Sequence, residues 1–207
     1  YTKVILIYIE GIKEGKKFLK VAPTVSHKKP VVILKSGVSD AGARAAASHT
    51  GSIAGSRIAY DAAFRRCGVL RASSIEELFN LGIAFSYQPI PQGRSVAIIT
   101  NAGGPSIVAA DACSQHGLNM AWFSAQTIEI LRKNLPGEAS STNPVDVLGD
   151  ALADPYEFAL GAILDDPNVD IVLVLLTPQA MTDPTYTAEA VVKIAGQKPA
   201  KPILACF

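Results

Sequence analysis

The sequence predicts an α/β protein of two tandem domains with parallel sheets, and three observations support this. Short β-branched apolar runs alternate with amphipathic segments along the whole chain, as in parallel sheets covered by helices. Two prolines and a glycine in the segment 87–93 separate two such series. The 207 residues, 49% of them hydrophobic, are enough for two modest cores. We expect one domain over 1–88, a linker over 89–93 and a second domain over 94–207.

The first half of the chain predicts three strands and three helices. Its opening apolar run is typical of a strand buried on both faces and ends at Glu10. Gly68 is placed to cap a helix at its carboxyl end, and Ser73 lies three residues before Glu76, as in a capping box. The expected elements are strand 4–9, helix 14–21, strand 31–35, helix 57–66, strand 69–71 and helix 74–85.

The second half restarts the alternation after the linker. Pro105 suits the first position of a helix, and Gly117 suits the cap that follows it. Because the chain starts just before one apolar strand and stops at another, we expect a fragment truncated at both ends. The expected elements are strand 95–100, turn 101–104, helix 105–115, strand 118–122, helix 124–133, an irregular stretch 135–153, helix 156–164, strand 169–176, helix 184–195 and strand 202–206.

Composition argues for chemistry at a localised site. Nineteen basic and eighteen acidic residues give a net charge of +1, and no basic stripe stands out, so we expect neither nucleic acid nor a membrane as partner. The cysteines, Cys67, Cys113 and Cys206, lack metal-ligand spacing, which favours reduced thiols, no metal site and a cytoplasmic protein. The longest apolar run, residues 171–176, is too short to span a bilayer.

His49 is the first candidate for a reactive residue. It lies in a run of small side chains, residues 45–56, which lets other groups approach the imidazole closely. Glu10 follows an apolar strand, where it either ends the strand in solvent or orients an imidazole and leaves the other nitrogen nucleophilic. Serine-hydrolase, zinc and complete nicotinamide-binding signatures are absent from the sequence. His49 is therefore a nucleophile or a structural residue.

A second candidate is the turn Asn101, Ala102, Gly103 and Gly104, between a strand and a helix. Amides at the start of a helix favour a bound anion, particularly phosphate, although such glycines can also serve the backbone alone.

The stretch 143–150 is a third unusual segment, because it alternates polar and apolar residues inside a long connection. Asp146 and Asp150 either cap nearby structure or bind Mg²⁺ together with a phosphate.

Three segments, residues 42–55, 100–105 and 143–151, together resemble the NDP-forming acyl-CoA synthetases, which include ADP-forming acetyl-CoA synthetases and belong to the succinyl-CoA synthetase superfamily. The resemblance implies a flavodoxin-like domain without its first strand, followed by a flavodoxin-like ligase-CoA domain that ends early. It implies a phosphohistidine at His49, oriented by Glu10. It also implies that Thr50, Gly51 and the turn 101–104 bind the phosphate.

The same resemblance implies the reaction acyl-CoA + phosphate + ADP ⇌ carboxylic acid + CoA + ATP, with Mg²⁺. CoA and nucleotide then bind mainly to a CoA-binding Rossmann domain and an ATP-grasp domain, in the full protein or on a partner subunit. We expect an oligomer and an inactive isolated fragment. A ligand-sensing module of a protein acetyltransferase and a purely structural fragment are alternatives. His49 and Glu10 favour catalysis, because acetyltransferase-linked relatives often replace the histidine.

Overall fold

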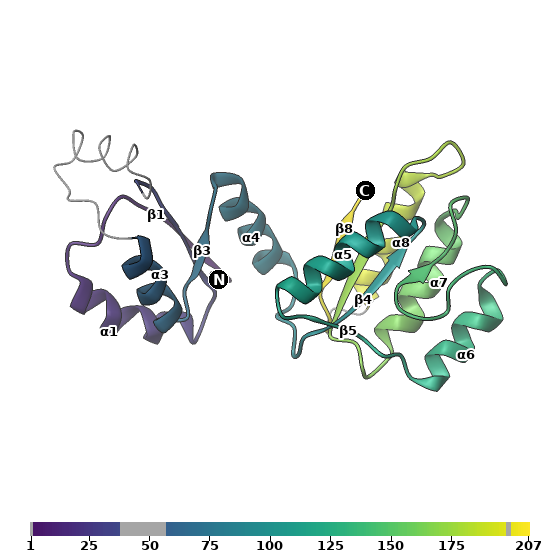
Figure 1. Cartoon of the computed structure of the whole chain (residues 1–207), viewed down its shortest axis with the longest axis horizontal. Helices are drawn as coiled ribbons and strands as arrows, with labels where there is room; N and C mark the ends of the chain where they lie inside the picture. The colour runs from purple at the N-terminus through teal and green to yellow at the C-terminus, as the bar shows by residue number, and fades with distance from the viewer. Residues whose placement is uncertain (1, 38–56, 198–199) are drawn as a thin grey trace. The chain divides into compact units, whose positions relative to one another are not determined.

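The structure, a computed structural model, describes residues 2–37, 57–197 and 200–207. The chain forms two compact units, Tyr1–Tyr87 and Gln88–Phe207, and each has its own sheet (Figure 1). All strand pairs within the two sheets are parallel, as expected when helices connect successive strands. The prediction of an α/β chain with tandem parallel-sheet folds is confirmed.

The first unit has a sheet of three described strands in the order β1-β2-β3. Its elements are β1 (Ile5–Ile9), α1 (Gly15–Ser26), β2 (Val31–Lys35), α3 (Arg57–Arg66), β3 (Leu70–Ala72) and α4 (Ile75–Tyr87). Odd-numbered residues of β2, such as Ile33, pack with Phe64 of α3 and with α1. Even-numbered residues, such as Leu34, pack with Leu78 of α4. Helices therefore cover both faces of β2, which is buried along its whole length.

β1 differs from its expected burial on both faces. Its residues alternate between partly buried and exposed, and Leu6 and Tyr8 are 37% and 56% exposed. The reason is its place at the edge of the described sheet, where α4 reaches only part of one face. Gly82 permits that approach, since a Cβ there would lie 2.7 Å from a methyl carbon of Leu6.

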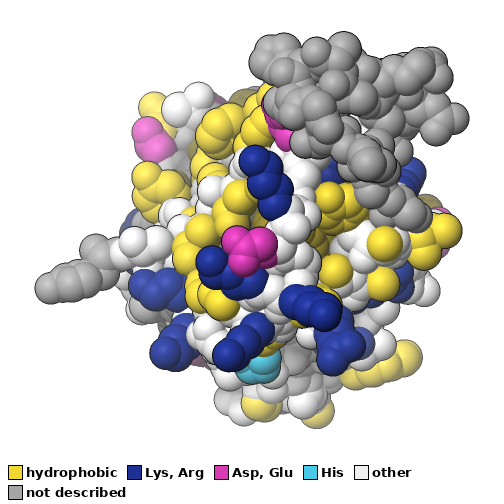
Figure 2. Space-filling model, turned by 90° about the vertical axis from the view of Figure 1, so that its left-hand side faces the viewer, with side chains coloured by type: hydrophobic (Ala, Val, Ile, Leu, Met, Phe, Trp, Pro, Cys, Tyr) yellow, Lys and Arg dark blue, Asp and Glu magenta, His cyan; other side chains and the backbone are white. Residues whose placement is uncertain are grey.

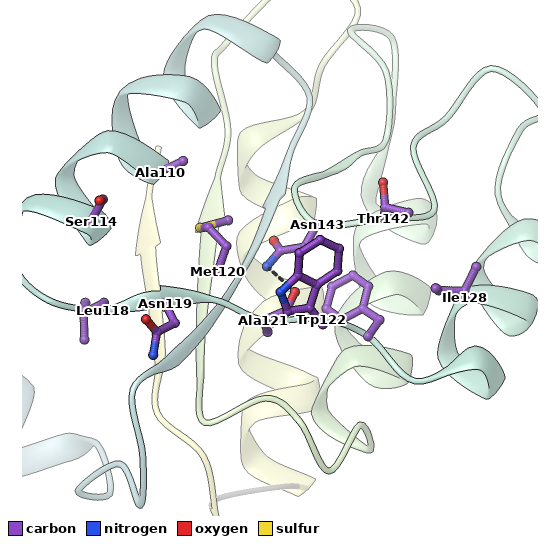
Figure 3. A pocket seen from close by; sticks show the side chains of 11 residues that line it. Ala110, Ser114, Leu118, Asn119, Met120, Ala121, Trp122, Ile128, Thr142 and Asn143 are labelled. Atoms are coloured by element: carbon purple, nitrogen blue, oxygen red, sulfur yellow. Dashed lines mark hydrogen bonds between the residues drawn. The ribbon is translucent and has the colours of Figure 1, made fainter.

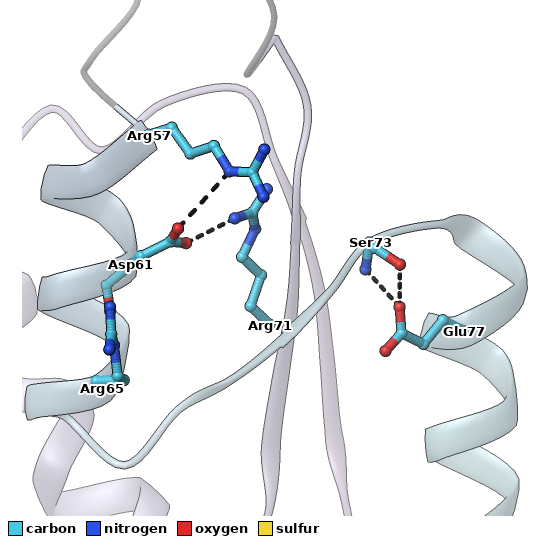
Figure 4. Close-up of polar contacts among 6 residues, drawn as sticks. All are labelled: Arg57, Asp61, Arg65, Arg71, Ser73 and Glu77. Atoms are coloured by element: carbon cyan, nitrogen blue, oxygen red, sulfur yellow. Dashed lines mark hydrogen bonds and ion pairs between the residues drawn. The ribbon is translucent and has the colours of Figure 1, made fainter. Parts of the chain in front are cut away.

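Two helix ends also differ from the sequence predictions. α1 continues beyond residue 21 to Ser26 and accommodates Pro23 in its last turn. The cap of α4 is formed by Ser74 and Glu77: the Ser74 hydroxyl accepts the Glu77 amide at 3.0 Å, and the Glu77 carboxylate accepts the Ser73 amide at 2.7 Å (Figure 4). The predicted pair was therefore one residue too early.

The second unit has a sheet in the order β5-β4-β7-β8, with β6 also paired to β4. Its elements are β4 (Ser95–Thr100), α5 (Gly103–Gln115), β5 (Asn119–Met120), α6 (Ala125–Asn134), β6 (Val145–Asp146), α7 (Ala153–Leu164), β7 (Ile171–Leu175), α8 (Pro184–Gln197) and β8 (Ile203–Cys206). Ile99 belongs to the core formed with α6, α7 and α8, whereas Ile98 belongs to the core beneath α5. Successive side chains of β4 therefore point to opposite faces of the sheet and contribute to both cores.

The short strand β6 lies in the stretch 135–153, which was expected to be irregular, and Asn143 explains how it joins the sheet. β5 and β6 pair with opposite ends of β4, and the Asn143 carboxamide fills the gap between them (Figure 3). It accepts the Ile98 amide at 2.9 Å and donates to the carbonyls of Val96 at 2.8 Å and Ala121 at 3.1 Å. A side chain thus completes the backbone pairing that the sheet requires. Asn143 also lines a cavity of about 610 Å³ beside β5.

Candidate functional site

The carboxyl ends of β1 and β2 meet at one edge of the first sheet. Ile9 pairs with Lys35, and the Ser36 amide donates to the Ile9 carbonyl at 3.0 Å. This register places Glu10, the residue after β1, at the end of the sheet from which the chain continues beyond β2. Ligands of open parallel sheets usually bind at this edge. His49, Thr50 and Gly51 lie outside the described residues.

Glu10 is a partly exposed carboxylate at this edge. Among the residues that the structure describes, none donates a hydrogen bond to its oxygens. Its charge raises the pKa of Lys35, whose side chain is almost completely buried and whose pKa is lowered overall by that burial. This arrangement is suited to receiving an imidazole N–H.

The candidate phosphate turn follows β4 in the second unit. The Thr100 hydroxyl pins the turn, accepting the Ala102 amide and donating to the Ala102 carbonyl, both at 3.0 Å. α5 begins at Gly103, two residues earlier than predicted, so Pro105 is its third residue. Proline is tolerated there because the first-turn amides have no partner within the helix.

Gly103 and Gly104 are exposed, and no side chain caps the helix that they begin. Neither has a positive φ, and a Cβ added to either meets no heavy atom within 4 Å. Neither the backbone conformation nor packing against described residues therefore requires glycine here. The first turn carries no acidic residue, so the helix dipole is not neutralised locally. Exposed amides at an uncapped helix start are groups that can bind an anion.

Asn101 has a different place from the one expected of a phosphate ligand. It is 3% exposed, its carboxamide oxygen accepts the Thr177 amide at 2.8 Å, and its nitrogen donates to the Thr177 carbonyl at 3.0 Å. Its side chain thus ties the turn to the segment after β7. This geometry assigns the side chain to holding the turn in place. The Ala102 amide is engaged by the Thr100 hydroxyl, so the Gly103 and Gly104 amides are those left for a ligand.

Of the two roles that the sequence allowed for Asp146, capping nearby structure or binding Mg²⁺, the structure shows capping. Its carboxylate accepts the Leu148 amide at 2.9 Å, and Leu148 has a φ of 79°, unusual for a residue with a large side chain. Burial first, and then the charge of Asp146, raises the pKa of Tyr156, whose hydroxyl donates to the Leu175 carbonyl. Asp150 is exposed, and within the described parts of the chain no three metal-ligating side chains come together.

The near-zero net charge conceals an uneven distribution. Residues 1–87 contain thirteen Lys and Arg against six Asp and Glu, whereas residues 88–207 contain six against twelve. Lys16, Lys17 and Lys20 lie in α1, and Figure 2 shows Lys and Arg gathered on the viewed face of the first unit. Charge counted by domain thus shows a basic excess in the first unit, which the net charge of the whole chain conceals.

Among the helices that the structure describes, none combines the length and apolar character needed to cross a membrane.

Two family models match the chain in succession. The succinyl-CoA ligase-like flavodoxin domain matches residues 1–85, and the ligase-CoA domain matches residues 96–206. The second match alone covers more than half of the chain.

Several characterised ligases are similar to the chain over nearly its full length. ADP-forming acetate–CoA ligase I of Archaeoglobus fulgidus is 50% identical over 192 residues, 92% of this chain and 28% of that protein. The α subunit of ADP-forming acetate–CoA ligase II of Pyrococcus furiosus is 47% identical over 209 residues, 99% of this chain and 45% of the subunit. The chain thus spans between about a quarter and a half of these relatives.

A solved structure is also similar. Acetyl-coenzyme A synthetase 1 of Candidatus Korarchaeum cryptofilum, described as dinucleotide forming and in complex with phosphate and ADP, superposes with a TM-score of 0.91 at 39% identity. The match covers 99% of this chain and 45% of that one. The order of the two domains, the sequence identity and the shared fold agree: the chain belongs to the NDP-forming acyl-CoA synthetase family of the succinyl-CoA synthetase superfamily.

Proposed function

We propose that the chain is the phosphohistidine-carrying part of an ADP-forming acyl-CoA synthetase. The complete enzyme interconverts acyl-CoA, phosphate and ADP with a carboxylic acid, CoA and ATP. The observation that carries this proposal is the 50% identity, across 92% of the chain, to an ADP-forming acetate–CoA ligase. Residues 1–88 form the histidine-bearing domain and residues 94–207 the ligase-CoA domain, joined by 89–93.

His49 accepts the phosphoryl group in this proposal. An imidazole nitrogen attacks the phosphorus of an acyl phosphate, the P–N bond forms, and the acyl phosphate P–O bond breaks to release the carboxylate. A terminal oxygen of ADP then attacks the same phosphorus, which releases His49 and forms ATP. Glu10 accepts the N–H of the other ring nitrogen and so fixes the tautomer. Its place after β1, without a described hydrogen-bond donor, supports this role.

In the turn 101–104, the phosphate of this reaction binds the amides of Gly103 and Gly104, together with Thr50 and Gly51; the Ala102 amide is engaged by Thr100. Support comes from the exposed Gly103 and Gly104, where the open space around each Cα leaves room for a phosphate oxygen to reach the backbone. Asn101 contributes by holding the turn through Thr177.

CoA, ATP or ADP, and Mg²⁺ bind mainly to other domains of the full-length enzyme. The described residues fit a phosphate but not a metal ion, since no three metal-ligating side chains are grouped among them. The long overhang of the relatives beyond the matched region supports a CoA-binding Rossmann domain and an ATP-grasp domain on the same polypeptide or a partner subunit. The α-subunit relative supports an oligomeric, multi-subunit enzyme. The three cysteines, none of them in a disulfide, support a location in the reducing cytoplasm.

The test is phosphorylation of the complete enzyme with ATP labelled at the γ-phosphate. We expect label that is lost in acid and kept in base, and that disappears in His49→Ala. His116→Ala is the matched control, because His116 is an exposed histidine at the end of α5. Glu10→Gln slows the labelling, whereas Glu14→Gln, at an exposed position nearby, leaves it unchanged.

Label that persists in His49→Ala would contradict the phosphohistidine assignment. An unlabelled wild-type protein that carries an acetyltransferase domain would instead favour the ligand-sensing function. Unchanged labelling in Glu10→Gln removes Glu10 from the mechanism while leaving the role of His49 intact.

A further inference from the structure

Buried polar side chains gather at the start of α5. Among the described residues, seven polar or charged side chains are buried, and three of them, Thr100, Asn101 and Ser106, lie within the short segment 100–106. Burying a polar group costs free energy unless hydrogen bonds replace those that it made with water. The hydrogen bonds of these three side chains therefore indicate what they stabilise.

Two of these side chains are hydroxyls that donate to consecutive carbonyls of the turn. The Thr100 hydroxyl donates to the Ala102 carbonyl at 3.0 Å, and the Ser106 hydroxyl donates to the Gly103 carbonyl at 2.7 Å. A peptide group is planar and joins the carbonyl of one residue to the amide of the next. The Thr100 hydroxyl thus bonds to the peptide group that carries the Gly103 amide. The Ser106 hydroxyl bonds to the one that carries the Gly104 amide.

A hydrogen bond accepted by a carbonyl strengthens the amide of the same peptide group as a donor. The bond draws electron density towards the oxygen and leaves the N–H more positive, and linked hydrogen bonds strengthen one another in this way by about 10–30% each. Gly103 and Gly104 are exposed, and no side chain caps the helix that they begin. Their amides are therefore strengthened from the protein side and remain open towards solvent.

The third buried side chain, Asn101, fixes the direction of the turn. Its carboxamide bonds to both the amide and the carbonyl of Thr177, which follows β7. The end of β7 is itself held from α7, because the buried Tyr156 hydroxyl donates to the Leu175 carbonyl at 2.9 Å. The turn is thus tied to a central strand of the sheet, which keeps its two glycine amides in one orientation.

A purely structural role is the alternative for such hydroxyls, since Ser and Thr in helices often bond to a carbonyl three or four residues earlier. Thr187 of α8 provides the comparison within the same unit. It is fully buried, and its hydroxyl donates to the Asp183 carbonyl at 2.8 Å. The peptide group of that carbonyl ends at Pro184, which has no amide hydrogen, so this bond strengthens no donor.

We propose that Thr100 and Ser106 are positioning residues for phosphate: their buried hydroxyls hold and polarise the two peptide groups whose amides, those of Gly103 and Gly104, bind it. The inference rests on the proposed function, in which these amides bind the phosphate of the reaction. It adds two side chains that act on the phosphate through the backbone.

Ser106→Ala removes one hydroxyl with little disturbance of α5. Alanine is the better helix former, so the unfolding temperature should stay close to that of wild type. The dissociation constant for inorganic phosphate should rise about two- to fivefold, because the Gly104 amide becomes a weaker donor to a charged oxygen. Equilibrium dialysis of the full-length enzyme against ³²P-labelled phosphate, without nucleotide or acyl-CoA, measures this constant. Ser114→Ala, at an exposed position of the same helix, is the control and leaves both measurements unchanged.

Thr100→Val tests the other hydroxyl and needs a control for stability, because it also leaves the Ala102 amide without its acceptor. Thr187→Val is that control, since it removes a buried hydroxyl that bonds to a peptide group without an amide hydrogen. We expect both variants to unfold at a lower temperature than wild type. Only Thr100→Val should weaken phosphate binding, again by about two- to fivefold, and Thr100→Ser should restore it.

Phosphate affinity equal to wild type in Ser106→Ala and Thr100→Val overturns the positioning role. A loss of affinity in Thr187→Val as large as that in Thr100→Val overturns it as well, because the loss then follows stability. Gly104→Ala in the same assay separates this result from the proposed function. If Gly104→Ala alone weakens phosphate binding, the turn is the phosphate site and the hydroxyls do not position it.

If neither Gly104→Ala nor the two hydroxyl variants change phosphate binding, the turn is not the phosphate site, and its proposed role fails together with this inference. Label that survives His49→Ala overturns the phosphohistidine alone, because phosphate binding is measured without phosphorylation.

Discussion

Gly104→Ala tests whether the glycines that begin α5 serve a bound phosphate or the fold. Gly104 is exposed, has no positive φ, and has no heavy atom within 4 Å of the position that a Cβ would take. Alanine therefore fits the protein without strain. If Gly104 leaves room for a bound phosphoryl group, the added methyl group hinders phosphoryl binding without disturbing the fold.

The two effects have opposite signs. Alanine in place of a helical glycine stabilises by about 0.5–1 kcal/mol, because it restricts the unfolded chain. For 207 residues this raises the unfolding temperature by about 1–4 °C, and by less in the longer full-length enzyme. Losing one hydrogen bond to a charged phosphoryl oxygen costs about 1.5–3 kcal/mol, which slows phosphorylation roughly 10- to 100-fold.

Two assays on the full-length enzyme measure these effects: thermal unfolding, and the initial rate of acid-labile labelling from γ-labelled ATP. Gly161→Ala is the matched control. Gly161 lies within α7, has no positive φ, and also has open space at its Cβ position. We expect it to gain stability by a similar amount and to keep the wild-type labelling rate.

The reasoning is refuted if Gly104→Ala is more stable but is labelled within twofold of the wild-type rate. The phosphate then does not use the space beside Gly104. A loss of stability in Gly104→Ala contradicts the structural premise itself, since that result requires a neighbouring atom or a backbone strain that the structure does not show.

Two further predictions concern stability. Asn143→Ala removes three hydrogen bonds to the sheet backbone, so it should lower the free energy of unfolding, measured by urea titration, by about 3 kcal/mol. Asn119→Ala is the control and should change this free energy little, because the Asn119 side chain is exposed. Equal effects of the two substitutions would contradict the role of Asn143 in completing the sheet. Hydrogen bonds from Ser73 lower the pKa of Glu77, so its carboxylate stabilises the fold above its unfolded-state pKa, and this contribution is lost as pH falls through the folded-state value. Thermal unfolding of Glu77→Gln should therefore match wild type only in acid, and a difference that persists there contradicts this explanation.

Local chemistry along the chain determined most of the fold. Alternation of apolar strands with amphipathic helices predicted the two parallel-sheet units, because each periodicity specifies which face must be buried. Gly68 and Gly117 were recognised as caps, and both have the positive φ of that position. The turn after residue 100 was located from its position between a strand and a helix, a relation that is local in sequence.

Relations between distant residues required the tertiary structure. The Asn143 carboxamide completes a sheet 45 residues away, the Asn101 carboxamide bonds to a segment 76 residues away, and nothing in the neighbouring sequence indicates either partner. The burial of Lys35 likewise depends on the tertiary structure, since lysine side chains are usually exposed. Sequence alone thus pointed to His49, Glu10 and the glycine turn as candidates. Only the packing showed which side chains hold the turn in place, because hydrogen bonds depend on distance in space and not on separation along the chain.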